Sequence, residues 1–213
     1  WLANHDGKQF LYYIGWNLGV TVPFRNSIGL CLSEHGGEFK RYAPGPIVDR
    51  SMTEPHFVAS CCVLPGSDKW RMWYLSCTDW RIRNKKPEHR YHIKYAESVD
   101  GISWRREGVV AIDYLDDSEY AVSRPSVIHD GDYWRMWFSH RGSAYRIGYA
   151  ESLDGINWQR LDADCQIDVS ESGWDSEMIE YPFVFDHKGA RSMLYNGNGY
   201  GKTGFGLAVF EAL

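Results

Sequence analysis

The pattern Tyr-Ala-Glu-Ser-x-Asp-Gly-Ile-x-Trp occurs twice in this chain, at residues 95–104 and 149–158, and the two copies are 54 residues apart. Each copy follows a second shared pattern, Trp-Arg-Met-Trp, at residues 70–73 and 134–137. Self-similarity with a period near 50 residues indicates a repeat architecture, in which each repeat is one supersecondary unit packed on its neighbours. This repeat constrains the fold more than any other feature of the sequence.

Four repeat units can be aligned, at about residues 1–42, 52–108, 120–162 and 176–213. In the third unit, short strands are expected at residues 126–129, 134–139, 146–151 and 158–161, with a hairpin turn at residues 129–132. No segment has a sustained helical period. Four short strands per unit predict an all-β fold, a β-propeller in which each unit is one blade of a single domain over residues 1–213.

The segment Ser-x-Asp-Gly-x-x-Trp within the longer pattern is expected to be structural. An aspartate can accept hydrogen bonds from backbone amides two residues on, and glycine tolerates a positive φ. The tryptophan is expected to pack between neighbouring sheets. We therefore interpret Asp100 and Asp154 as turn residues rather than catalytic ones.

Composition restricts the classes of partner. The net charge is −5 and there is no run of Lys or Arg, which argues against nucleic acid as a partner. No apolar stretch approaches 18 residues, so no membrane-spanning helix is expected. The ten Trp and fourteen Tyr residues point to a β-rich core and to surfaces on which sugars could stack. No oligomeric state follows from these features.

The five cysteines are scattered, without zinc-finger or CxxC spacing. This pattern favours buried thiols in a reducing cytoplasm over a disulfide framework. The histidines, including His56, His89 and His92, do not form a ligand set, so neither a metal nor another cofactor is predicted. The first residue is Trp rather than Met, which predicts a fragment of a longer chain whose upstream segment could include a signal peptide.

Charged residues stand next to proline where three of the units are expected to begin their first strand. They are Glu54 before Pro55, Arg124 before Pro125, and Glu180 two residues before Pro182. Proline is permitted at the first position of a strand. Two carboxylates and a guanidinium around the same opening of a propeller would shift one another's pKa values. Glu54 and Glu180 are therefore the catalytic candidates, and Arg124 is a substrate-binding candidate. A structural ion pair between Glu54 and Arg124 is the alternative.

The loops between the expected second and third strands supply further candidates for substrate binding. Aromatic rings beside amide, imidazole and guanidinium groups suit a polyhydroxylated ligand, so a carbohydrate is the expected partner. The candidates are Trp16, Asn17, Trp80, His92, His140, Arg146, Asn196 and Tyr200. Lys202 with Arg124, Arg141 and Arg146 could instead hold a phosphate or carboxylate, and solvated loops without a ligand are the other alternative.

Taken together, the x-Pro strand starts, the Trp-x-Met-Trp-Tyr/Phe strands and the Tyr-Ala-Glu-Ser-x-Asp-Gly-x-x-Trp turns resemble the five-bladed β-propeller glycosidases. That superfamily includes arabinanases, β-xylosidases, invertases, levansucrases and the related mannoside phosphorylases. The resemblance covers residues 5–211 and is strongest to bacterial glycosidase-like proteins that share the Tyr-Tyr-Ile-Gly-Trp-Asn and Tyr-Asn-Gly-Asn-Gly-Tyr-Gly patterns.

The resemblance implies that the four units are blades two to five, with one blade and a strand, about 80–100 residues, upstream. It also implies catalytic carboxylates at the axial starts of the first three blades, and it matches Glu54 with the general acid of the third. The partner carboxylate would then lie upstream, or Glu180 would substitute for it. The hypotheses left open are a glycosidase-like enzyme, a carbohydrate-binding propeller without catalysis, and a phosphorylase in which Arg124, Arg146 and Lys202 hold phosphate. A self-contained four-bladed propeller is the structural alternative.

Overall fold

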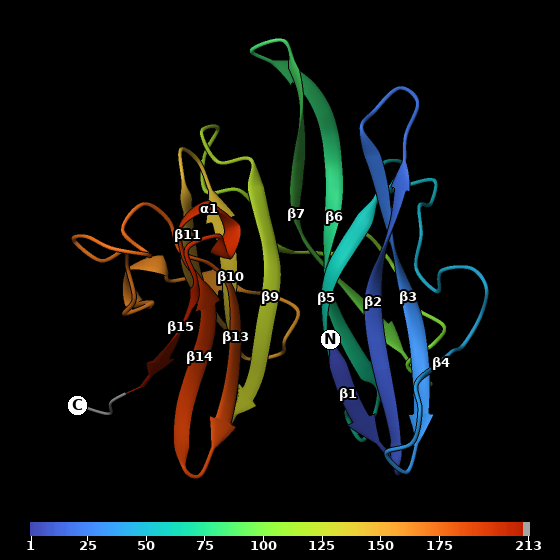
Figure 1. The fold of residues 1–213 in the computed structure, drawn as a ribbon. Coiled ribbons are helices and arrows are strands. Elements are labelled where there is room, and N and C mark those ends of the chain that lie inside the picture. Colours follow the sequence, from blue (N-terminus) through green and yellow to red (C-terminus); the bar gives the residue numbers. More distant parts are fainter. Residues whose placement is uncertain (211–213) are drawn as a thin grey trace. The chain divides into compact units, whose positions relative to one another are not determined.

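The computed structural model describes residues 1–210 and consists almost entirely of antiparallel β-sheet (Figure 1). The chain divides into two compact units: unit 1 is Trp1–Asp113 and unit 2 begins at Tyr114. Each unit holds two of the predicted repeats. The prediction that the chain forms a single domain stays a prediction.

The first sheet of unit 1 is a four-stranded antiparallel meander in the order β1-β2-β3-β4. Its strands are β1 (Leu2–His5), β2 (Lys8–Leu18), β3 (Phe24–Glu34) and β4 (Lys40–Arg41). The turn between β1 and β2 falls at Asp6 and Gly7, with φ values of 49° and 74°. Positive φ at both central residues matches the twist of the flanking strands in a tight hairpin.

The second sheet of unit 1 is dominated by one long hairpin. Its strands are β5 (Val58–Leu64), β6 (Trp70–Arg83), β7 (Lys86–Ser98) and the short β8 (Val110–Ile112). The β6–β7 ladder continues from Trp70↔Ser98 to Arg83↔Lys86. The prediction of a loop around Trp80 and residues 90–92 was therefore wrong, because continuous cross-strand pairing carries this segment as two extended strands.

Unit 2 repeats the same plan twice. Its first sheet is β9 (Ala121–Asp130), β10 (Tyr133–Arg141), β11 (Tyr145–Ser152) and β12 (Gln159–Arg160). Its second sheet is β13 (Glu180–His187), β14 (Ala190–Asn196) and β15 (Phe205–Val209). Two short helical turns, η1 (Asp162–Asp164) and α1 (Asn198–Gly201), lie in the connections. The end of the fourth predicted repeat unit, residues 211–213, lies outside the described residues.

The predicted all-β class is confirmed. Within each sheet of the two units, strands that are consecutive in the chain pair antiparallel. Within residues 1–210 there is no helix with the length and apolar character needed to cross a membrane.

The hydrophobic core of unit 1 contains Ile28, Val63, Met72 and Tyr74, all nearly inaccessible to solvent. A corresponding core in unit 2 is formed by residues from β11, β13 and β14 and from the connections between them; these residues are Ile147, Tyr149, Cys165, Ile179, Val184 and Met193. Because strands with both faces covered read as near-continuous apolar runs, this packing explains the aromatic and aliphatic residues on both faces of β6 and β10.

The first copy of the repeated pattern is a turn closed by its own side chains. The hydroxyl oxygen of Ser98 accepts hydrogen bonds from the backbone amides of Asp100 (3.1 Å) and Gly101 (2.9 Å). The Asp100 Oδ1 atom accepts bonds of 2.8 Å from the amides of Ile102 and Ser103. Gly101 has a φ of 72°, a conformation that glycine adopts without cost.

The second copy repeats this geometry. Ser152 Oγ accepts from the amides of Asp154 (3.2 Å) and Gly155 (2.9 Å), and Asp154 Oδ1 accepts from those of Ile156 and Asn157, each at 2.8 Å. Partial burial alone would raise the pKa of Asp154, but these hydrogen bonds outweigh it and lower the pKa to about 2. The predicted structural role of the pattern is confirmed.

Candidate active site

Three sheets begin with a strand that carries a β-bulge at the same position. The bulged residue has a positive φ in each case: 31° at Ser60, 53° at Arg124 and 59° at Tyr181. The strand register shifts at each of these points. The residues that directly precede the bulge, and that are therefore equivalent, are Ala59, Ser123 and Glu180. Bulges often lie next to active sites because they redirect a side chain.

This register corrects one prediction from the sequence. Glu54, Arg124 and Glu180 were expected at equivalent strand starts because each lies one or two residues before a proline, but Glu54 precedes β5 and pairs with Ser51 in a turn before the strand. The alignment on proline was wrong because proline marks only a missing backbone donor. The pairing of neighbouring strands sets the position of the bulge.

Glu54 is buried, with 2% of its surface exposed, and its carboxylate is surrounded by donors. Ser76 Oγ donates a 2.7 Å hydrogen bond to Oε1, and the Tyr74 hydroxyl lies 3.0 and 3.1 Å from the two oxygens. Arg106 donates at 2.7 Å to Oε2, and Lys94 Nζ lies 3.6 Å from Oε1. Both oxygens are therefore already engaged within unit 1.

Glu119 has the same arrangement one repeat later. Arg160 donates hydrogen bonds of 2.7 and 3.1 Å to the two Glu119 oxygens, and His140 Nδ1 lies 2.7 Å from Oε1. Arg160 and His140 hold the positions in the repeat that Arg106 and Ser76 hold in the previous one. Burial would raise the pKa of Glu119, but the bonds from His140 and Arg160 outweigh it and lower the pKa to about 2.

A third buried carboxylate follows the pattern in the last sheet. Tyr195 lies opposite the bulge of β13, as Tyr74 lies opposite that of β5. The Tyr195 hydroxyl donates a 2.9 Å hydrogen bond to Asp175, which is buried. A buried acid that anchors the segment before the first strand of a sheet through hydrogen bonds is thus a recurring structural feature. The sequence analysis did not identify this feature at Glu119 and Asp175. The signal available for it was an acid five or six residues before each bulged residue.

Glu180 differs from these three acids. Its side chain is 0% exposed, and neither carboxylate oxygen has a hydrogen-bond partner. Burial raises the pKa of Glu180 to about 7, and the charges of Arg141 and Arg124 lower it only in part. An unpartnered buried carboxyl group is costly, and such groups concentrate at functional sites.

Three tyrosines and two arginines gather near Glu180, and we name them the tyrosine–arginine cluster. The ring centroids of Tyr145, Tyr181 and Tyr200 are 6.0–6.5 Å apart. The guanidinium of Arg124 lies 4.5 Å from the centre of the Tyr181 ring, and that of Arg141 lies 5.2 Å from the centre of the Tyr145 ring. Arg141 also donates a 2.7 Å hydrogen bond to the Tyr200 hydroxyl.

Backbone geometry positions these side chains. The Tyr181 amide donates a 2.7 Å hydrogen bond to Ser139 Oγ on β10, which fixes the bulge of β13. Tyr200 lies in the glycine-rich stretch that contains α1, between Gly199 (φ 64°) and Gly201 (φ 81°). The side chain of Asn198 holds this stretch by accepting a 2.8 Å bond from the Glu177 amide. Tyr181 was not selected as a binding residue from the sequence, because the register that brings it beside Tyr145 and Tyr200 is not visible there.

Of the other predicted binding residues in unit 2, Asn196 lies opposite Glu180 in the β13–β14 ladder. Arg146 donates hydrogen bonds to the backbone carbonyls of Tyr145 and Glu177, and its Nε lies 3.2 Å from Asp168. His140 contacts Glu119, as described above.

The predicted binding residues of unit 1 lie on strands. Trp16 and Asn17 are on β2, Trp80 is on β6 and His92 is on β7. Trp16 is 65% exposed, and its ring lies 4.7 Å from that of Phe24, which in turn lies 5.2 Å from Trp80. The structure therefore brings Trp16 and Trp80 into one aromatic group through Phe24, a residue not selected from the sequence.

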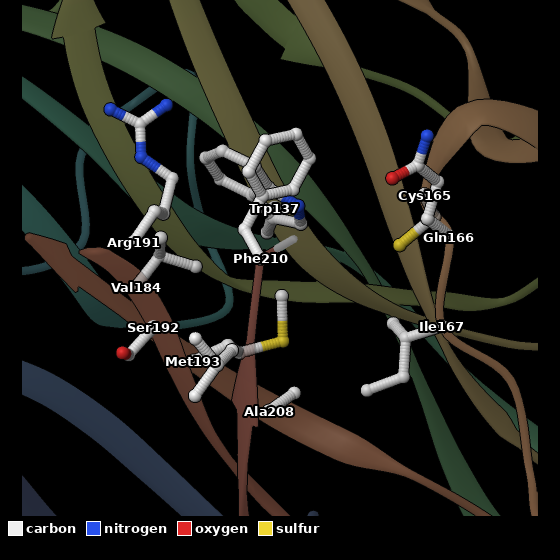
Figure 2. Close-up of a pocket in the computed structure, with 11 residues that line it drawn as sticks. Trp137, Cys165, Gln166, Ile167, Val184, Arg191, Ser192, Met193, Ala208 and Phe210 are labelled. Carbon is white, nitrogen blue, oxygen red and sulfur yellow. The ribbon is translucent and has the colours of Figure 1, made fainter. Parts of the chain in front are cut away.

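A pocket of about 270 Å³ in unit 2 is lined mainly by apolar side chains, among them Trp137, Met193 and Phe210 (Figure 2). Arg191 at its edge is already paired with Asp130 and Asp186. The pocket contains none of the predicted site residues. No group of three or more His, Cys, Asp or Glu side chains within residues 1–210 is arranged to hold a metal ion.

Comparison with known proteins gives the family. No protein-family model matches the chain. The uncharacterized protein Rv1502 of Mycobacterium tuberculosis H37Rv is 46% identical over 203 residues, which are 95% of this chain and 67% of Rv1502. The chain belongs to the Rv1502 family. The corresponding protein MT1551 of strain CDC 1551 shows the same identity and coverage. The chain spans about two thirds of the length of both proteins.

Solved structures similar to this Rv1502-family chain include a glycoside hydrolase, at a TM-score of 0.75 and 18% identity over 99% of this chain and 65% of that protein. The BT0996 protein, solved as an RGII complex, has a TM-score of 0.76 at 18% identity, over 99% of this chain and 65% of BT0996. A β-fructofuranosidase of Bombyx mori has a TM-score of 0.68 at 16% identity, over 91% of this chain and 41% of the enzyme. An endo-arabinase of Bacteroides thetaiotaomicron has a TM-score of 0.63 at 15% identity, over 100% of this chain and 73% of the enzyme. The predicted β-propeller class is confirmed, and the resemblance to glycosidases holds for the fold.

Proposed function

We propose that this Rv1502-family protein is a glycosidase-like enzyme that acts on a glycosidic bond, with Glu180 as its general acid. One observation carries this proposal. Of the four buried carboxylates in residues 1–210, Glu54, Glu119 and Asp175 are held by hydrogen bonds, whereas Glu180 has no hydrogen-bond partner. The fold shared with glycosidases supports carbohydrate as the substrate class.

The chemistry of glycoside cleavage needs a carboxylic acid that is still protonated near neutral pH. The acid donates its proton to the glycosidic oxygen as the bond to the anomeric carbon breaks. A pKa of about 7 keeps a large fraction of Glu180 protonated at that pH, and it lies where a general acid is most effective. Glu54, the acid matched from the sequence, instead contacts two cations and two hydroxyls, which makes it the weaker candidate.

The tyrosine–arginine cluster supports sugar binding at the same place. Tyrosine rings offer flat apolar faces for a sugar ring together with hydroxyls that can donate and accept hydrogen bonds. Tyr200 is 53% exposed, and Tyr145 is almost fully buried. Because Glu180 is inaccessible, a substrate that reaches it must displace a covering side chain, and Tyr200 is the most exposed ring of the cluster.

A second function, carbohydrate binding without cleavage, is supported by the complete burial of Glu180. A carboxyl group that no substrate reaches would serve only as a neutral buried group. The aromatic group around Trp16 and the exposed Tyr200 would then be the binding surfaces.

The test uses the full-length protein and a panel of oligosaccharides, with product release measured by chromatography and binding by calorimetry. Glu180→Gln is expected to reduce turnover by about 100-fold or more, the typical effect of losing a general acid, while binding is retained. Glu177→Gln, which alters an exposed carboxylate three residues away, is the matched control and should keep full activity. Binding without any product would favour the second function, and full activity of Glu180→Gln would exclude the proposed role.

A further inference from the structure

Two arginines of unit 2 differ from the rest in having no acidic partner. Within the described part of unit 2, the guanidiniums that have a carboxylate within 4.0 Å are those of Arg135, Arg146, Arg160 and Arg191. Arg124 and Arg141 form no such ion pair there. Both belong to the tyrosine–arginine cluster.

Arg124 and Arg141 are nevertheless held in place. Arg124 lies over the face of Tyr181, and Arg141 is held by the Tyr145 ring and the Tyr200 hydroxyl. Contacts with ring faces fix a guanidinium plane and leave N–H groups at its edge free to donate. The Nε atom of Arg141 is buried and has no acceptor, so at least one buried donor at this site lacks a partner.

Glu180 does not supply the missing acceptor. Its two oxygens are buried without a hydrogen bond, and neither arginine lies within ion-pair distance of them. With Glu180 protonated, the site holds two guanidinium charges and no carboxylate charge. Such a site favours an anion, and a guanidinium suits the planar carboxylate and the tetrahedral phosphate because both can accept two parallel hydrogen bonds.

We infer that the saccharide bound at the tyrosine–arginine cluster carries an acidic group, a carboxylate or a phosphate ester, which Arg124 and Arg141 bind. This inference rests on the proposed function, since it takes the cluster to be the sugar site. The acidic group occupies the unfilled donors of the two arginines, and the tyrosine rings contact the sugar.

The experiment compares acidic and neutral sugars that are otherwise alike. Calorimetry on the full-length protein at pH 7 would use oligogalacturonate against galacto-oligosaccharide, and glucose 6-phosphate against glucose. In at least one pair the acidic sugar is expected to bind at least 10-fold more tightly, and the advantage should shrink in high salt because charge attraction is screened. The pair that shows the advantage identifies the anion as a carboxylate or a phosphate.

Variants assign the effect to the two arginines. Arg124→Gln and Arg141→Gln are each expected to bring the affinity for the acidic sugar close to that for its neutral counterpart. Arg135→Gln, which removes an arginine already paired with Asp130 and Glu151, should leave the preference unchanged. Circular dichroism confirms that each variant is folded. Arg141→Lys, which keeps the charge, should restore part of the preference.

The outcomes separate the two proposals. Equal affinity for acidic and neutral sugars, with turnover that depends on Glu180, would overturn the inference and leave the proposed function standing. A preference for acidic sugars that survives both Gln substitutions would also overturn it. Tight binding of acidic sugars without turnover would support the inference and count against the enzymatic proposal.

Discussion

Arg106 donates a 2.7 Å hydrogen bond to the buried carboxylate of Glu54. This bond joins the segment that precedes β5 to the segment that follows β7. The pair recurs one repeat later as Arg160 and Glu119, again with a 2.7 Å bond. Two independent copies of one geometry indicate a structural element of the repeat. The acid that departs from the pattern, Glu180, is the one to which we assign chemistry.

The first prediction concerns Glu54. Glu54→Gln removes the negative partner of Arg106 and Lys94, and breaking a buried ion pair typically costs about 3–5 kcal/mol. We expect the free energy of unfolding, measured by urea denaturation, to fall by an amount of that order. If Glu54 were instead the general acid, the variant would lose turnover while its unfolding curve stayed in place.

The second prediction concerns acid stability. The pKa of Glu119 is about 2 in the folded protein and near 4.5 when unfolded, so its contribution is fully present above pH 4.5 and is lost as the pH falls toward 2. The contribution is on the order of 3 kcal/mol, since one pKa unit corresponds to about 1.4 kcal/mol. Glu119→Gln should therefore be less stable than wild type at pH 6, and the gap should close in acid. A gap that is independent of pH would contradict this assignment.

The third prediction concerns Glu180, whose effect on stability changes with pH in the direction opposite to that of Glu119. The pKa of Glu180 is raised from 4.5 to about 7, so the folded state binds the proton more tightly and loses stability as the pH rises through this window. Glu180→Gln, a neutral mimic of the protonated acid, should match wild type near pH 4.5 and exceed it above pH 7. The expected gain is on the order of 3 kcal/mol. If the free energies of unfolding of wild type and Glu180→Gln differ by the same amount at every pH from 4.5 to 8, Glu180 does not titrate in that range.

The fourth prediction compares three glycines with positive φ. Gly131→Ala introduces only backbone strain, about 1–2 kcal/mol, because no atom lies within 4 Å of the new methyl group. At Gly101 the methyl would lie 2.8 Å from the Trp70 ring, and at Gly155 it would lie 3.1 Å from Trp134. We expect thermal melting temperatures to fall in the order Gly101→Ala most, then Gly155→Ala, then Gly131→Ala. Equal losses would mean that strain alone sets the cost.

Several features of the fold could be predicted because they depend on residues close together in the chain. The turn of the repeated pattern is one: its hydrogen bonds join Ser98 to amides two and three residues later, so the sequence alone specifies the geometry. The hairpin turn predicted at residues 129–132 is another, since β9 ends at Asp130 and β10 begins at Tyr133. The length of the β6–β7 hairpin was missed, because polar and aromatic residues in an exposed ladder resemble those of a loop.

The repeat, the all-β class and the structural role of the pattern that recurs at Tyr95 and Tyr149 follow from the order of residues in the chain. Which acid is available for chemistry depends instead on how the strands pack. Glu54 and Glu180 both lie near a proline, yet cross-strand register gives one of them four donors and leaves the other buried without any. The physical reason is that a turn is specified by neighbours in the chain, whereas burial and charge pairing depend on residues that folding brings together, such as Arg106 with Glu54, 52 residues away.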